Sequence, residues 1–491
     1  MFEDIKKTSK QTLVYSVGNV LPKLVGFVLI PLYLSKLSTY AFGVLTILFS
    51  ISQIMIGIFG FNIHTAMLRW LEVDKSKDYK KSIVFTAFIS TILIAVTISL
   101  MTIPFSKEIS IALFSTTDYS VYFIWLVISS GVGIINNIPL NLIRYFEKPY
   151  YYILISSIKF IIILGLNFYF LLYTNLGIEG IIIAELVGNI YLLLQSAHFI
   201  YSNMIAVFNY NAFLGMFKYG LPLIFSTLST LALSLSDRFI IKYYLGDSNV
   251  GIYSLGNKIA SFINVFIIQS FQLGFLPIAL KKFSDPKSKR FFVKVFTYFT
   301  LLLVYTALFF ALFSMEIVKY FSSNKSYWAA YTVIPALSLG FVLRGMQYII
   351  SLVFYYEKKT HYNAVIVLIS ALINILLNIL LIPIIGILGA AWAFVISTFI
   401  LIIMTYFYSQ KFYFLNYEIG KTIKLFLTAF FIFFLASLVN GESISIRILT
   451  KTFLLILLPA ILYTLNYYEE IEIKKIKEIS LQALSFFKII K

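Results

Sequence analysis

Five basic side chains stand inside long apolar stretches of the sequence, where a charge needs a partner or water. They are Lys23, Lys159, Arg238, Lys258 and Arg344. A lysine or arginine at the centre of a membrane helix costs about 2.5–3.5 kcal/mol on insertion scales. Both side chains pair well with phosphate oxygens. We therefore identify these cations as candidate binding groups for an anionic ligand, with phosphate or pyrophosphate as the leading chemistry.

Three acidic residues lie in the same apolar stretches: Glu179, Glu185 and Asp237. Cations outnumber them, which favours an anionic ligand. Asp237 and Arg238 project about 100° apart on a helix, so we do not expect a simple pair between them. Asp237 and Glu185 are candidates for pairing with a cation of another helix or for binding a coupling proton, whereas Glu179 is expected near the membrane surface.

Most of the cations belong to polar rows that repeat every three or four residues, which keeps each row on one helix face. Asn19 precedes Lys23, and Gln347 follows Arg344. A further row carries Asn137 and Asn141. We predict that these four amides line the same cavity as the cations. The alternative for the small and hydroxyl residues of these rows is helix-to-helix packing.

The helices that carry these residues are predicted to cross a membrane. The chain has 491 residues, of which 60% are hydrophobic and 12% are charged, about half the charged fraction of a soluble domain. About 20 apolar residues span a bilayer as a helix. We therefore predict an all-α integral membrane protein with about 14 spans, at 11–34, 41–63, 82–104, 120–143, 150–174, 178–201, 219–243, 251–275, 292–315, 330–355, 362–384, 389–409, 422–440 and 448–467.

The distribution of basic residues predicts the orientation. With both termini in the cytoplasm, 27 of the 39 Lys and Arg residues are cytoplasmic and 7 are external, as the positive-inside rule requires. The net charge of +18 is therefore assigned to topology, and no nucleic-acid partner is expected. The tail, 468–491, is predicted to lie on the anionic inner leaflet as an amphipathic helix.

The two halves of the chain match each other at an offset of about 208 to 211 residues. The matches are Phe42-Gly43-Val44 with Val250-Gly251-Ile252, Tyr145–Lys148 with Tyr355–Lys358, and Gly177-Ile178 with Gly386-Ile387. Six spans per half give a parallel repeat: an N-lobe (1–210), a C-lobe (211–410), two extra helices (411–467) and the tail (468–491). Paired bundles of this kind bind substrate between the halves. None of the five cations falls on another under this shift, so the charges are specific to one half.

Other chemistry finds little support in the sequence. There is no Gly-x-x-x-x-Gly-Lys-[Ser/Thr] loop for a nucleotide. The chain has no cysteine, and its three histidines are scattered, so neither a metal nor another cofactor is expected. The loops are too short for the extramembrane domain of a glycosyltransferase. We therefore expect a transporter and not an enzyme.

Several segments resemble the polysaccharide-unit flippases, the Wzx-type members of the multidrug/oligosaccharidyl-lipid/polysaccharide exporter superfamily. They are Tyr219–Pro222, Leu235–Ile240, Val250–Ser254, Phe59–Asn62 and Arg69-Trp70. The resemblance covers essentially the whole chain. It implies two lobes around a cationic cavity that moves a polyprenyl-pyrophosphate-linked oligosaccharide across the bacterial cytoplasmic membrane for O-antigen or capsule, alongside other polysaccharide assembly proteins. A multidrug antiporter of the same superfamily and a membrane-embedded enzyme of glycan assembly are the alternatives.

Overall fold

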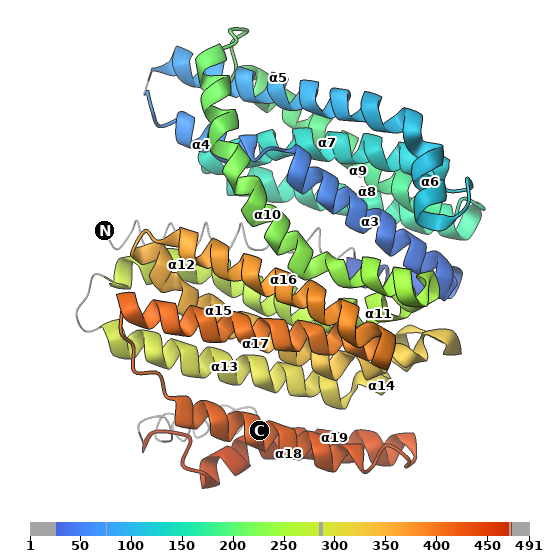
Figure 1. The fold of residues 1–491 in the computed structure, drawn as a ribbon, viewed down its shortest axis with the longest axis vertical. Helices are drawn as coiled ribbons and strands as arrows, with labels where there is room; N and C mark the ends of the chain where they lie inside the picture. The colour runs from blue at the N-terminus through green and yellow to red at the C-terminus, as the bar shows by residue number, and fades with distance from the viewer. Residues whose placement is uncertain (1–25, 75, 284–287, 471–472, 474–491) are drawn as a thin grey trace, which may run out of the picture.

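The computed structural model describes residues 26–74, 76–283, 288–470 and 473, and within these ranges the regular structure is entirely helical (Figure 1). The elements are α2 (Ile30–Lys36), α3 (Thr39–Phe59), α4 (Ile63–Trp70), α5 (Lys77–Thr102), η1 (Ile103–Phe105), α6 (Ser106–Phe114), α7 (Ser120–Tyr145), α8 (Pro149–Tyr173), α9 (Ile178–Ser202), α10 (Tyr210–Leu245), α11 (Asp247–Ala260), η2 (Ile263–Ile268), α12 (Gln269–Phe283), α13 (Ser288–Leu312), α14 (Ser314–Phe321), η3 (Lys325–Thr332), α15 (Ile334–Tyr356), α16 (Thr360–Ile385), α17 (Ile387–Phe412), α18 (Ile419–Ser437) and α19 (Ile444–Thr464).

Thirteen helical stretches of the described residues are long and apolar enough to cross a membrane, and they coincide with the second to fourteenth predicted spans. Most of the first predicted span lies outside the described residues; the described part is helical from Gly26. The amphipathic tail also falls largely outside them. The prediction of an all-α, multi-pass membrane fold with about 14 spans is confirmed.

Local sequence sets the helix ends. The side chain of Ser38 accepts a hydrogen bond from the backbone N–H of Ala41 at the start of α3, and Asn209 caps α10 in the same way, which satisfies N–H groups that lack a helical partner. Gly177 and Gly386 have φ of +50° and +65°, a region that glycine enters without steric penalty. These two residues separate α8 from α9 and α16 from α17, so both predicted breaks are confirmed.

The repeat is visible in the packing of two bundles. In the first, α7 packs against α5 and α9, and α8 against α9; in the second, α15 packs against α13 and α17, and α16 against α17. Figure 1 shows the first bundle above the second, with α18 and α19 beyond it. The turns after α7 and α15 share one hydrogen bond, from Lys148 N–H to the oxygen of Ile143 and from Lys359 N–H to that of Phe354. This hydrogen bond makes Lys148 equivalent to Lys359, whereas the sequence match pairs Lys148 with Lys358. At this turn the structural repeat is therefore shifted by one residue from the sequence match.

Helix α10 runs between the two bundles (Figure 1). It contains 36 residues, which exceeds the roughly 20 that a bilayer requires. It contacts α4 and α5 of the first bundle as well as α16 of the second. A lobe boundary at residues 210 and 211 therefore remains a prediction.

The bundles meet where α3 crosses α11, at the end of the molecule that holds α6 and α14 (Figure 1). The crossing points are Gly43 and Gly251, which the repeat makes equivalent. A Cβ at Gly43 would lie 3.1 Å from the backbone nitrogen of Gly251, and a Cβ at Gly251 would lie 3.1 Å from that of Gly43. Each would also overlap a backbone carbonyl oxygen, of Asp247 and Thr39 respectively. Only glycine permits this approach of two backbones.

Ion pairs attach the extra helices α18 and α19 to the second bundle at both ends. At one end, Lys294 of α13 lies 2.8 Å from Glu418 and 2.5 Å from Glu469. At the other, Lys451 of α19 lies 3.0 Å from Glu316 of α14, and its side chain is only 3% exposed. The charge of Lys451 is thus buried against a carboxylate, the pairing that a buried charge needs.

We predict that substituting Gly43 by Ala weakens the contact between the bundles. The methyl group has no room, and overpacking of this kind lowers the free energy of unfolding by about 1–3 kcal/mol. The measurement is the midpoint of thermal unfolding of the purified protein in detergent. Gly165→Ala in α8 is the matched control, because nothing lies within 4 Å of its added methyl group. An equal effect of both substitutions would contradict the prediction.

A second prediction concerns acid sensitivity of the attachment at Lys294. Burial raises the pKa of Glu418, whereas hydrogen bonds from Lys294 and Thr297 lower it. The lowering is larger, so the pKa of Glu418 lies below its usual value. The stabilisation is therefore complete above the ordinary carboxyl pKa and is lost as the pH falls through the lowered value. On acidification, the midpoint of thermal unfolding should fall less in Glu418→Gln than in the wild type. The exposed Glu442→Gln should behave like the wild type; a wild-type acid response in Glu418→Gln would refute the assignment.

Candidate functional site

Two adjacent cavities lie inside the fold, one between the bundles and the other mainly within the first bundle. One, of about 470 Å³, is lined mainly by α3, α10, α11 and α15, and we call it the C-side cavity. The other, of about 460 Å³, is lined mainly by α3, α7, α8 and α9, and we call it the N-side cavity. They share the lining residues Tyr33, Phe49, Gln53 and Lys258. Together they form the central cavity of the fold.

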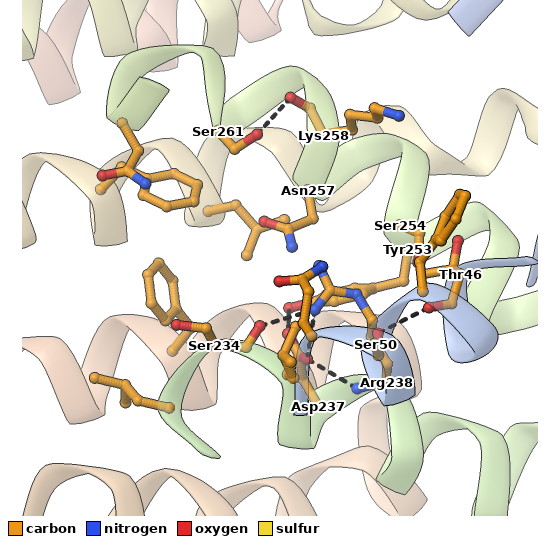
Figure 2. A pocket seen from close by; sticks show the side chains of 18 of the residues that line it. Thr46, Ser50, Ser234, Asp237, Arg238, Tyr253, Ser254, Asn257, Lys258 and Ser261 are labelled. Atoms are coloured by element: carbon orange, nitrogen blue, oxygen red, sulfur yellow. Dashed lines mark hydrogen bonds and ion pairs between the residues drawn. The ribbon is translucent and has the colours of Figure 1, made fainter. Parts of the chain in front are cut away.

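The C-side cavity collects polar side chains from three helices. Figure 2 shows Thr46 and Ser50 of α3, Asp237 and Arg238 of α10, and Lys258 of α11 around it. The guanidinium of Arg238 donates from Nη1 to the backbone oxygen of Ser234 at 2.8 Å. Its Nε is buried and has no hydrogen-bond acceptor among the described residues. Arg238 therefore keeps one enclosed donor without a partner behind the cavity wall.

The carboxylate of Asp237 is occupied by neighbours from its own half. It accepts hydrogen bonds from the hydroxyl of Tyr253 at 2.6 Å and from the backbone N–H of Arg238 at 2.8 Å. The guanidinium of Arg238 lies 3.9 Å from the same carboxylate, within ion-pair distance, so the expectation that Asp237 and Arg238 form no simple pair is wrong. Among the described residues, no cation of the facing bundle pairs with Asp237.

Lys258 and Arg344 line the C-side cavity and, among the described residues, no carboxylate lies within ion-pair distance of either. The Lys258 ammonium lies 5.8 Å from the centre of the Tyr33 ring, at the junction with the N-side cavity. The charged residues that line the C-side cavity are thus three cations and Asp237. The arrangement leaves an uncompensated positive charge that an anion can neutralise.

The N-side cavity holds a neutral ion pair. Lys159 of α8 lies 3.2 Å from Glu185 of α9 and donates to Oδ1 of Asn189 at 2.7 Å. Glu185 is therefore the partner of a predicted site cation. Asn136 and Asn137 of α7 line the same cavity. The Nδ2 of Asn136 donates to the backbone oxygen of Asn189 at 2.9 Å, which fixes its amide orientation and leaves the buried Oδ1 without a donor among the described residues.

The structure separates the remaining predicted residues from the cavities or does not describe them. Asn141 donates to the backbone oxygen of Asn137, and Gln347 to Asn363 and Thr405; neither is among the residues that line the two cavities. Gln347 is only 8% exposed, so this part of its row serves packing within the second bundle. Lys23 and Asn19 lie outside the described residues.

Several lining residues were missed by sequence reasoning although their spacing was visible. Thr46, Ser50 and Gln53 follow one face of α3 at intervals of four and three, and Asn189 stands four residues after Glu185. Such intervals keep side chains on one helix face. The row on α3 carries no charge, so its spacing is the only signal that marks it in the sequence.

Solved membrane transporters share this fold. The lipid II flippase MurJ in an inward closed conformation is 15% identical, with a TM-score of 0.70 over 94% of this chain and 98% of that chain. An inward-facing multidrug resistance MATE family transporter of the MOP superfamily is 14% identical, with a TM-score of 0.64 over 82% of this chain and 94% of that one. A MOP superfamily transporter from Pyrococcus furiosus, whose binding pocket is described as having reverse polarity, is 14% identical, with a TM-score of 0.62 over 82% and 95%.

The chain therefore has the fold of solved transporters of the MOP superfamily. The family described as polysaccharide biosynthesis protein matches residues 8–283, more than half of the sequence, and the chain belongs to that family. The MatE family matches residues 222–380. No curated protein matches the chain.

Because the chain has no cysteine, single cysteines can report which amides face water. We predict that Asn137→Cys reacts readily with a water-soluble maleimide in intact membranes, since Asn137 lines the N-side cavity. Gln347→Cys should react much more slowly, because the side chain is enclosed within the second bundle. Labelling after denaturation controls for expression. Comparable rates at the two positions in membranes would contradict this description of the cavity.

Proposed function

We propose that the protein moves a polyprenyl-pyrophosphate-linked oligosaccharide from the inner to the outer leaflet by alternating access. The observation that carries the proposal is the cluster of Arg238, Lys258 and Arg344 around the C-side cavity, with Asp237 as the carboxylate among its lining residues. Arginine and lysine bind phosphate oxygens through charge-assisted hydrogen bonds, which are stronger than neutral ones. Membership of the polysaccharide biosynthesis protein family supports a glycan cargo.

The cavity suits a cargo with a charged head and an apolar tail. The polar groups lie between the bundles and within the first bundle, where they are shielded from the hydrocarbon, while a polyprenyl chain can remain in the bilayer beside them. The contact of α3 with α11 closes the end that holds α6 and α14, so the cargo leaves by that end only after these helices separate. Rocking of paired bundles about a central site provides such a motion.

The distribution of Lys and Arg favours a cytoplasmic location of both termini, which makes the α6 and α14 end external. The corresponding membrane is the bacterial cytoplasmic membrane, where glycan units for O-antigen or capsule are transferred. Other polysaccharide assembly proteins would act on the cargo before and after it crosses. The protein itself needs no bond-breaking chemistry for this task.

A multidrug antiporter of the same superfamily is the second candidate, because the MatE family matches residues 222–380 and a MATE transporter shares the fold. Cationic drugs require acidic binding groups. The charged residues that line the C-side cavity are mostly basic, and Asp237 already accepts hydrogen bonds from Tyr253 and from the backbone of Arg238. The charge balance therefore favours the lipid-linked glycan.

We predict that the purified protein, reconstituted in vesicles, accelerates transfer of a fluorescent polyprenyl-pyrophosphate disaccharide between leaflets. Arg344→Gln and Lys258→Gln should each lower the rate about tenfold or more, since a hydrogen bond to a charged group contributes about 1.5–3 kcal/mol. A membrane-impermeant quencher measures how much lipid has reached the outer leaflet.

Lys36→Gln is the matched control, because Lys36 is exposed at the end of α2 and is not among the cavity residues. It should transfer the lipid at the wild-type rate. A wild-type protein that leaves the rate equal to that of protein-free vesicles would overturn the proposal, and export of a cationic dye by the same vesicles would support the antiporter instead.

A further inference from the structure

The two halves of the central cavity leave different kinds of hydrogen-bonding atom unpaired. Among the described residues that line the C-side cavity, the buried unpaired atoms are Nε of Arg238 and the hydroxyl of Ser254. In the N-side cavity, the corresponding atom is Oδ1 of Asn136. A guanidinium nitrogen only donates, and an amide oxygen only accepts. Buried polar atoms are normally paired, and these three are enclosed behind the cavity walls, so a ligand reaches them only if the neighbouring side chains move.

The two halves also differ in charge. The C-side cavity has uncompensated cations, whereas Lys159 and Glu185 neutralise each other in the N-side cavity. Lys258 lies at the junction and belongs to both. A multiply charged group that only accepts hydrogen bonds, such as pyrophosphate, fits the C-side cavity. A neutral group rich in hydroxyl donors fits the N-side cavity.

The wall of the N-side cavity is rich in amides that can bind hydroxyl groups. Asn137 and Gln53 line it, and their side chains have no hydrogen-bond partner among the described residues. Asn136 is only 3% exposed and supplies the unpaired acceptor. Side-chain amides offer both donors and acceptors, as sugar hydroxyls do. These three amides come from α3 and α7, which face each other in the first bundle.

From these differences we infer that the cargo binds in one orientation. Its pyrophosphate contacts Arg238, Lys258 and Arg344 in the C-side cavity, and its first sugars, which carry no charge, contact Asn136 and Asn137 in the N-side cavity. The inference rests on the proposed function and adds to it a neutral saccharide class and a separate glycan subsite on α7. Lys258 lies where the two subsites meet, next to the glycosyl phosphate bond of the cargo.

The test uses the purified full-length protein and three soluble short-chain probes: a prenyl pyrophosphate, the same lipid bearing a neutral disaccharide, and the same lipid bearing a disaccharide with one uronic acid. Equilibrium binding is measured for each by tryptophan fluorescence or calorimetry. In the wild type, the neutral glycolipid should bind more tightly than the bare pyrophosphate and more tightly than the acidic one. Tighter binding of the acidic probe would overturn the neutral class.

Variants then separate the two subsites. The side chain of Asn137 has no hydrogen-bond partner among the described residues, so Asn137→Ala breaks none of their hydrogen bonds. This substitution should weaken binding of the neutral glycolipid only, about three- to tenfold, as expected for a neutral hydrogen bond. Asn136→Leu should do the same and, as a larger change, is accompanied by a thermal-unfolding measurement. Arg344→Gln should weaken both the bare and the glycosylated pyrophosphate by similar factors. Asn203→Ala, at the end of α9 and outside both linings, should change neither.

The possible failures are distinguishable. If the wild type binds neither pyrophosphate probe, the proposed function itself fails. If it binds both, but Asn137→Ala weakens the bare lipid as much as the glycolipid, or weakens neither, then the glycan subsite on α7 is refuted while the proposed function stands.

Discussion

The contact between Gly43 and Gly251 is the constraint on which the rest of the structure depends. These residues are equivalent in the repeat, and their missing side chains let the backbones of α3 and α11 touch. The cavity begins one helical turn beyond the contact, where Thr46 and Ser50 of α3 face Ser254 of α11. A single close crossing thus joins the two bundles at one end and leaves a polar space between the same two helices along their remaining length.

The symmetry of the scaffold does not extend to its charges. Equivalent helices pack in equivalent pairs in both bundles, yet Arg238, Lys258 and Arg344 come from the second half while the Lys159 and Glu185 pair comes from the first. Burying unpaired cations is unfavourable unless water or an anion reaches them. The second half therefore carries groups whose charge a ligand can satisfy, and the first half carries a pair that is satisfied without one.

The sequence predicted the spans well because each is a long apolar run whose length the bilayer sets. It also predicted the breaks at Gly177 and Gly386, where a glycine stands between two such runs. The residues of the candidate site were harder to predict than the spans. A charged residue such as Arg344 or Lys159 is conspicuous in an apolar stretch, but the partner of Lys159 depends on how α8 and α9 are rotated about their axes. Gln347 shares the row of Arg344 and yet packs inside the bundle, because spacing along one helix does not reveal which neighbour covers it.

The internal neutralisation of Lys159 by Glu185 has a consequence for divergence within the family. Because the charges of this pair cancel, Asn136 and Asn137 can be exchanged for other uncharged polar residues without changing the net charge of the N-side cavity. The cations of the C-side cavity have no such freedom, since each substitution there changes a net charge in a medium of low polarity. Under the proposed function, a new sugar can therefore be accommodated by substitutions on α7, which carries Asn136 and Asn137, while the cations of the opposite wall keep their charge.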